Sequence, residues 1–269
     1  TTEIYTLSLH DALPIFTIDV MLVMKSFLII SLLVFNINSM FSQSFLENQK
    51  NYERVKTAYK EKLSNVEMLL MASKLDLKDL QLLFRIFKQE KTLEVWVKKK
   101  ADSSFKLITT YPLCSTSGKP GPKRRQGDEQ MPEGVYKISQ FNPTSNFYLS
   151  MRVDYPNAAD IKNCKTGNPG NDIFIHGNCV TIGCFPIGDD AIKELYIMAI
   201  EASAQSQYRI PVYIFPAKMN AENMQSLISL YPEHKAFWEN LKTIYDSFEK
   251  SKKNPLVRIT AQGTYEISN

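Results

Sequence analysis

The side chains best suited to chemistry in this chain are His176 and Cys184, which lie eight positions apart. The chain has three histidines and four cysteines, so both residue types are scarce. A cysteine attacks a carbonyl carbon as the thiolate, and a neighbouring imidazole can take the thiol proton. Gly183 leaves room beside the sulfur for a substrate backbone. This pattern predicts a cysteine acyltransferase site.

Other roles for these residues are open. Cys184 could be a buried structural thiol, because free cysteine is among the most buried residue types. His176 could equally be a core histidine at the end of a strand. A zinc site at His176, Cys179 and Cys184 is a third interpretation, but their spacing lacks the usual Cys-x2-Cys knuckle. We therefore expect no metal and no cofactor.

The remaining cysteines, Cys114, Cys164 and Cys179, can form at most one disulfide if Cys184 stays free. The sequence does not select the pair. We expect Cys179 to be structural or to line the site, and Cys184 to be the thiol that alkylating reagents modify first.

The N-terminal residues are expected to be absent from the mature protein. Residues 1–23 are interpreted as spurious upstream sequence. Residues 24–43 combine a lysine, an apolar run and small residues, which is typical of a secretory signal peptide. The run is shorter than the roughly 20 residues of a membrane span, although an uncleaved anchor is the alternative. We expect export to the periplasm without a retained anchor.

The charge of the chain is modestly basic. The formal net charge is +4, and removal of residues 1–43, which have two more acidic than basic residues, raises it to +6. Such an excess suits an anionic wall polymer. No basic stripe interleaved with aromatic residues is present, so we expect no nucleic-acid partner.

The order of predicted elements indicates an α+β fold with a mainly antiparallel β-sheet and flanking N- and C-terminal helices. Residues 44–79 form a helical segment, because apolar residues recur every three to four positions. Residues 80–217 contain short strands and one helix that begins at the acidic pair Asp189-Asp190. Residues 218–269 add an amphipathic helix, Pro232–Lys250, and short strands.

A segment rich in glycine and proline, residues 114–134, interrupts the strands. Such loops often lie over functional sites, although a solvated connection is an equal alternative. The segment carries four basic residues, which are Lys119, Lys123, Arg124 and Arg125.

Residues 80–217 resemble the catalytic domain of the L,D-transpeptidases. The core pattern of that family is a His-Gly dipeptide followed by Ser/Thr-x-Gly-Cys, which corresponds here to His176-Gly177 and Thr181-Ile-Gly183-Cys184. The match is closest to the periplasmic branch that includes the lipoprotein-detaching murein amidase. Its further matches are Tyr111-Pro-Leu-Cys114, Ser117-Gly-Lys-Pro-Gly-Pro-Lys123, Pro132-Glu-Gly-Val-Tyr136 and Tyr155-Pro-Asn157. The resemblance implies a β-sandwich-like catalytic domain.

The resemblance also implies roles for the motif residues. Cys184 is the nucleophile and His176 the general base that later acts as an acid. Gly177, Thr181 and Gly183 shape the site and the oxyanion position. The substrate is the tetrapeptide stem of peptidoglycan, from which the thiol displaces the terminal D-Ala to form a thioester. A wall amine, a lysine of a wall-linked lipoprotein or water then accepts the acyl group.

One position departs from the family pattern. Many members have an arginine just after the nucleophile, where this chain has Phe185. We expect Lys123 to contact a substrate carboxylate instead, with Ser117 and Gly118 also binding substrate and Arg124 solvated.

Competing functions share these residues. Transpeptidation differs from hydrolysis, or from amidase release of a wall-bound protein, only in the acceptor, so the sequence does not choose between them. A non-catalytic wall-binding module would not need both His176 and Cys184. A papain-like protease would place its cysteine near the mature N-terminus and its histidine far downstream, the reverse of the order here.

Overall fold

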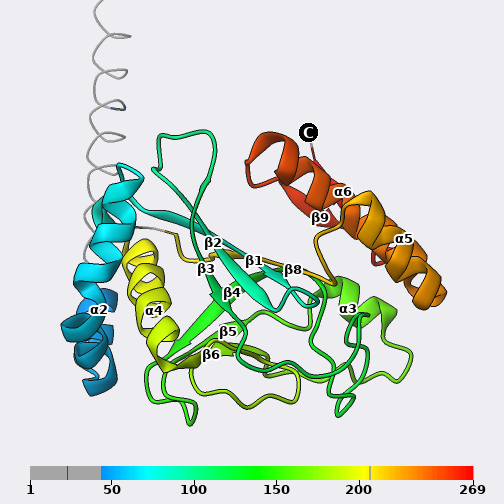
Figure 1. Ribbon diagram of the computed structural model, residues 1–269, viewed down its shortest axis with the longest axis horizontal. Helices are drawn as coiled ribbons and strands as arrows, with labels where there is room; N and C mark the ends of the chain where they lie inside the picture. Colours follow the sequence, from blue (N-terminus) through cyan, green and yellow to red (C-terminus); the bar gives the residue numbers. More distant parts are fainter. Residues whose placement is uncertain (1–22, 24–43, 206, 269) are drawn as a thin grey trace, which may run out of the picture. The chain divides into compact units, whose positions relative to one another are not determined.

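The centre of the protein is a curled eight-stranded β-sheet with helices on either side (Figure 1). In the computed structural model the described residues are 23, 44–205 and 207–268. Apart from Val23, the predicted upstream segment 1–23 and signal peptide 24–43 lie outside the described residues. None of the described helices is long and apolar enough to cross a membrane.

The sheet has the strand order β3-β2-β1-β8-β4-β5-β6-β7. Neighbouring strands are antiparallel except for two parallel pairs, β1 with β8 and β6 with β7. The predicted α+β class with a mainly antiparallel sheet is therefore confirmed. The strands are β1 (Gln81–Phe87), β2 (Thr92–Lys98), β3 (Lys106–Pro112), β4 (Gly134–Asn142), β5 (Ser150–Val153), β6 (Phe174–His176), β7 (Phe185–Pro186) and β8 (Pro211–Phe215).

Strand β4 joins the two halves of the sheet. Its first residues, from Gly134 to Lys137, pair with β8, and its later residues, from Ile138 to Asn142, pair with β5. The register shifts between Ile138 and Gln140, which is typical of a β-bulge and of a strongly twisted strand. The short strands β5, β6 and β7 thus form an outer half that carries the candidate residues.

Two helices cover one side of the sheet. Helix α4 (Gly188–Ala204) lies between helix α2 (Glu53–Ala72) and the strands (Figure 1), and most of its side chains are buried because it is covered from both directions. Its first turn holds Asp189 and Asp190, whose charges favour a helix N-terminus. A single turn of 3-10 helix, η1 (Leu77–Asp79), leads from α2 into the sheet.

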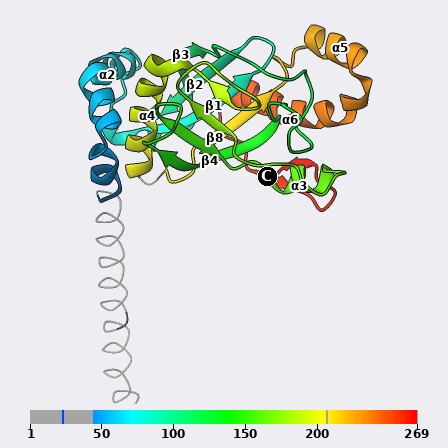
Figure 2. The same cartoon turned by 90° about the horizontal axis from the view of Figure 1, so that it is seen from below.

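The C-terminal elements lie on the opposite side (Figure 2). The amphipathic helix predicted at Pro232–Lys250 is a short 3-10 turn, η2 (Pro232–His234), followed by α6 (Lys235–Ser251). Its apolar face, including Trp238 and Phe248, packs on sheet residues such as Phe87. The remaining elements are α3 (Ala158–Asn163), α5 (Ala221–Leu230), β9 (Val257–Ile259) and β10 (Tyr265–Ile267).

A buried ion pair links this C-terminal helix to the glycine- and proline-rich loop. Lys88 Nζ lies 2.8 Å from Glu133 Oε1 and also donates to the carbonyl oxygens of Gly121 and Met131, at 2.8 and 2.9 Å. Glu133 Oε2 accepts a 2.8 Å hydrogen bond from Trp238 Nε1. Because both charges are buried, their mutual pairing is what makes their burial tolerable.

We predict that Glu133→Ala destabilises the protein by about 3–5 kcal/mol, because it leaves the buried Lys88 ammonium without a counter-charge. Urea unfolding followed by circular dichroism measures the loss. The control is Glu239→Ala, which breaks an exposed pair with Lys235 and should cost less than about 1 kcal/mol. Equal, small losses from both variants would contradict this role for Glu133.

Candidate active site

The candidate histidine lies on β6, and the candidate cysteine lies just before the adjacent strand β7. His176 ends β6 and Cys184 immediately precedes β7, and the parallel register sets Ile175 beside Phe185. Ile175 and Phe185 are both buried in the core. Because side chains alternate between the two faces of a strand, His176 and Cys184 share the opposite face. The structure therefore brings the two predicted residues onto one face of the sheet.

The surroundings of His176 leave one ring nitrogen available as a base. The ring is 1% exposed, and Nδ1 hydrogen-bonds to the carbonyl oxygen of Gly177. A carbonyl can only accept, so Nδ1 carries the proton and Nε2 keeps a free lone pair. The Phe147 ring packs 4.7 Å from the imidazole. Burial lowers the pKa of His176, against the opposing effect of the Gly177 hydrogen bond, so the imidazole is neutral near pH 7.

The Cys184 sulfur is a thiol in the resting protein. Sγ donates to the carbonyl oxygen of Asp172 at 3.5 Å, and within the described part of the chain no hydrogen bond joins it to His176. Burial raises the pKa of Cys184, and the Phe174 backbone N–H and the Lys123 charge only partly oppose this. Cys184 is thus a protonated thiol and His176 a neutral imidazole in the resting protein.

Two glycines allow the backbone to pack closely around the site. Gly183 has φ +139°, and a Cβ there would lie 3.2 Å from the carbonyl oxygen of Gln130. A Cβ on Gly177 would lie 2.6 Å from Asp189 Oδ1, closer than real Cβ contacts. Any larger residue would therefore displace the loop at both positions.

Hydrogen bonds of Thr181 fix the turn before the cysteine. Its Oγ1 donates to the Cys184 carbonyl oxygen at 2.8 Å and accepts from the Gly183 N–H at 3.1 Å. The Gly177 N–H is also used, since it donates to the Leu149 carbonyl oxygen. These residues shape the site, but the N–H groups of Gly177 and Gly183 have partners within the fold.

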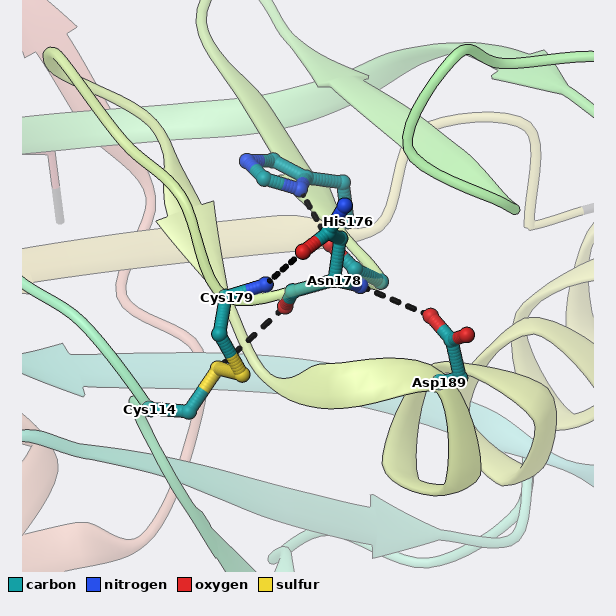
Figure 3. Close-up of a disulfide and its surroundings, with 6 residues drawn as sticks. Cys114, His176, Asn178, Cys179 and Asp189 are labelled. Atoms are coloured by element: carbon teal, nitrogen blue, oxygen red, sulfur yellow. Dashed lines mark hydrogen bonds between the residues drawn. A yellow bond between two sulfur atoms is a disulfide. The ribbon is translucent and has the colours of Figure 1, made fainter.

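A disulfide ties the loop between His176 and Cys184 to the end of β3. Cys114, just after β3, is bridged to Cys179, with a Cα–Cα distance of 5.4 Å (Figure 3). The Cys114 N–H donates to the Pro186 carbonyl oxygen at 3.0 Å, and the Asn178 N–H donates to Asp189 Oδ1 at 2.7 Å. The loop between the histidine and the cysteine is therefore held from both sides.

The basic loop residues are arranged differently from the sequence-based expectation. Lys123 is 5% exposed, and its Nζ contacts Asp128 Oδ1 and the Arg125 carbonyl oxygen. Arg124, which we expected to be solvated, instead pairs with buried Asp160 at 3.2 Å. The error has a physical reason: the loop folds back on itself, so these two charges meet carboxylates while Arg125 stays exposed.

Ser117 and Gly118 line a cavity of about 320 Å³ that is separate from the candidate pair. Its other walls include Lys88 and Leu230, and neither His176 nor Cys184 lines it. Five predicted residues thus lie at the end of β6 and in the loop that leads to β7, whereas Ser117 and Gly118 lie elsewhere. The five are His176, Gly177, Thr181, Gly183 and Cys184.

Two aspartates complete the site without having been predicted as site residues. Asp172 supplies the carbonyl oxygen that accepts from the thiol, and it has a left-handed backbone with φ +58°. Asp189 was interpreted only as a helix-start residue, yet its carboxylate holds the turn at Asn178. No local pattern indicates either contact. Among the described residues, no cluster of three His, Cys, Asp or Glu side chains could hold a metal ion.

Comparison with known proteins defines the class to which this fold and site belong. The sequence pattern of the L,D-transpeptidase catalytic domain, YkuD, matches residues 84–214. The chain belongs to the L,D-transpeptidase family. A relative is YafK of Escherichia coli K12, named as a candidate L,D-transpeptidase, with 37% identity over 186 residues. That alignment covers 68% of this chain and 72% of YafK.

Solved structures show weaker similarity. The helical cell shape determining protein Pgp2 of Campylobacter jejuni, as a K307A mutant, has 18% identity and a TM-score of 0.41, covering 68% of this chain and 72% of that one. Bd1075 of Bdellovibrio bacteriovorus has 20% identity and a TM-score of 0.38, covering 68% of this chain and 78% of that one. Similarity this low says nothing about function.

We predict that loss of the disulfide destabilises the protein. A cross-link spanning 65 residues restricts the unfolded chain, an effect of typically about 2–4 kcal/mol. The double variant Cys114→Ser/Cys179→Ser should show this loss in urea unfolding, whereas Cys164→Ser, which removes a free thiol, should not. Unchanged stability of the double variant would show that the bridge does not hold this loop.

We further predict that iodoacetamide modifies Cys164 before Cys184 in the resting protein at pH 7, reversing the expectation from sequence. A hydrogen bond with Thr166 lowers the pKa of Cys164, whereas burial raises the pKa of Cys184. Peptide mapping after timed alkylation gives the order. Faster modification of Cys184 would mean that its thiolate is already formed without substrate.

Proposed function

We propose that this chain is an exported cysteine acyltransferase that acts on the tetrapeptide stems of peptidoglycan. Family membership supports the reaction class. The observation that carries the assignment is the His176 tautomer: Nδ1 is held by the Gly177 carbonyl, so Nε2 is free on the face that also carries the Cys184 thiol. A neutral imidazole in that position is a general base for the sulfur.

In the first step, His176 Nε2 takes the proton of the Cys184 thiol as sulfur attacks the carbonyl that precedes the terminal D-Ala. A C–S bond forms, and the carbonyl oxygen becomes an oxyanion. We assign its stabilisation to the backbone N–H of Cys184, because the N–H groups of Gly177 and Gly183 are engaged. His176 then returns the proton to the leaving D-Ala amine, the C–N bond breaks, and a thioester remains.

In the second step, the acyl group passes to an acceptor, and His176 removes the acceptor's proton. A stem-peptide amine gives transpeptidation, a lysine of a wall-linked lipoprotein gives protein attachment, and water gives hydrolysis. Attack of the thiol on the amide that joins a lipoprotein lysine to the stem, with the lysine amine as leaving group and water as the acceptor of the acyl group, gives amidase-like release. We take a stem amine as the acceptor and the periplasm as the place of reaction. A non-catalytic wall-binding module is the remaining alternative.

Product analysis tests the proposal. The mature protein is incubated with disaccharide-tetrapeptide, and the products are identified by mass. Cross-linked dimer is the expected product, whereas disaccharide-tripeptide alone would assign hydrolysis. Cys184→Ser should release no D-Ala and retain the wild-type unfolding midpoint. If the wild-type protein is folded and leaves the disaccharide-tetrapeptide unchanged, the proposed activity is contradicted.

The pH dependence of acylation provides a separate prediction. Burial lowers the pKa of His176 from its ordinary 6.5, so the wild-type rate should fall only below that pH and level off above it. His176→Ala must rely on the thiolate, and burial raises the pKa of Cys184 above its ordinary 9.0. Its rate should be about 10²–10⁴-fold lower near pH 7 and still rise at pH 9.

Both profiles are measured as D-Ala release in a Cys164→Ser background, so that only one free thiol is present. Identical profiles for wild type and His176→Ala would exclude His176 as the base.

A further inference from the structure

A cavity of about 700 Å³ is lined by neither His176 nor Cys184 and has no role in the proposed reaction. Three segments form its walls: residues 121–130 of the glycine- and proline-rich loop, residues 163–166 after α3, and residues 233–237 at the start of α6. The last of these segments lies outside residues 84–214, which match the family pattern. The cavity therefore depends on the C-terminal extension of this chain.

The cavity presents cations that are available to a ligand. Arg125 and Lys165 are exposed, and neither side-chain cation has a hydrogen-bond or ion-pair partner among the described residues. Arg124 is fixed in the wall by Asp160 and lies 5.1 Å from the Phe237 ring centroid. Of the acidic lining residues, Asp128 is neutralised by Lys123, which leaves Glu233. The lining is therefore net positive and suits an anionic ligand.

The rest of the lining is suited to a short peptide. Pro122, Ala236 and Phe237 provide apolar surface. Gln130 Oε1, Asn163 Nδ2 and Thr166 Oγ1 already have partners in the fold, so among the described residues Gln130 Nε2 and Asn163 Oδ1 are the amide atoms left to hydrogen-bond to a peptide backbone. A free inorganic anion would use only the cations. A chain that carries carboxylates and small apolar side chains, such as the alanines of a peptidoglycan stem, would use all three kinds of surface.

The cavity shares a wall with the reaction centre. Gln130 lines the cavity, and its carbonyl oxygen lies 3.2 Å from where a Cβ on Gly183 would be. Asp128, also in the lining, holds Lys123, whose charge acts on Cys184. The glycine- and proline-rich loop thus contacts both the cavity and the segment that precedes Cys184.

We propose that this cavity is a second peptide site, which binds a carboxylate-bearing peptidoglycan stem next to the stem under attack. The identity of the ligand rests on the proposed function, whereas the anionic-peptide chemistry rests on the cavity. Arg125 and Lys165 bind the carboxylates, and Phe237 with Pro122 accommodates the small side chains.

Cys164 provides a local reporter for the test. It lies between the lining residues Asn163 and Lys165, and in a Cys184→Ala variant it is the only free thiol, because Cys114 and Cys179 are bridged. The rate of its alkylation by iodoacetamide is measured with increasing disaccharide-tetrapeptide. We expect at least a threefold slowing at saturation, with an apparent affinity that weakens as salt is added.

Removal of one cavity cation should weaken this protection selectively. Arg125→Ala is expected to lower the apparent affinity about tenfold, the size of one hydrogen bond to a charged group. Lys60→Ala is the control, because Lys60 is an exposed cation on α2 outside the cavity and should leave protection unchanged. A peptide with amidated carboxylates should not protect.

Three results would overturn the proposal: no protection of Cys164, equal protection by sulfate at the same ionic strength, or equal loss in Arg125→Ala and Lys60→Ala. Equal protection by an unrelated acidic peptide of the same charge would overturn the assignment to a stem. The assay involves no acyl transfer. If the stem peptide protects Cys164 but the wild-type protein releases no D-Ala, only the proposed function is contradicted. If the wild-type protein releases D-Ala but Cys164 is not protected, only the proposed second peptide site is contradicted.

Discussion

The buried pair between Lys88 and Glu133 is the interaction on which the arrangement around the active site depends. The loop it supports is rich in glycine and proline and forms no helix or strand, so its carbonyl groups need donors from elsewhere. The Lys88 ammonium donates hydrogen bonds to the carbonyl oxygens of Lys119, Gly121 and Met131. Glu133 completes the network by accepting from Trp238 of α6. The C-terminal helix, the loop and the sheet are therefore fixed by one pair of charges.

The glycine- and proline-rich loop also affects the surroundings of Cys184. Its Gln130 backbone packs against Gly183, and its Lys123 charge partly offsets the effect of burial on the pKa of Cys184. β6 carries His176, and β7 begins just after Cys184. These strands are only three and two residues long, so they do not fix the conformation of the loop between them. The disulfide at Cys179 and the Asp189 carboxylate supply the remaining constraint. The same loop forms one wall of the proposed second peptide site.

Much of this could be predicted from sequence, because it is encoded locally. The spacing of His176 and Cys184 identified the candidate site, and helical periodicity located α6 within three residues at either end. The disulfide partner of Cys179 could not be predicted, since it depends on the end of β3 meeting a loop 65 positions away. The burial of Lys123 could not be predicted either, because it results from a turn that returns Asp128 to the lysine.

In the proposed reaction, Cys184 forms a thioester with the stem peptide after proton transfer to His176. The most direct test is intact-protein mass spectrometry after rapid mixing with disaccharide-tetrapeptide and an acid quench. We expect a covalent adduct of the substrate mass less D-Ala, mapped to Cys184, absent in Cys184→Ser and strongly delayed in His176→Ala. A folded wild-type protein that releases D-Ala without any adduct on Cys184, or with the adduct on Cys164, would contradict this mechanism.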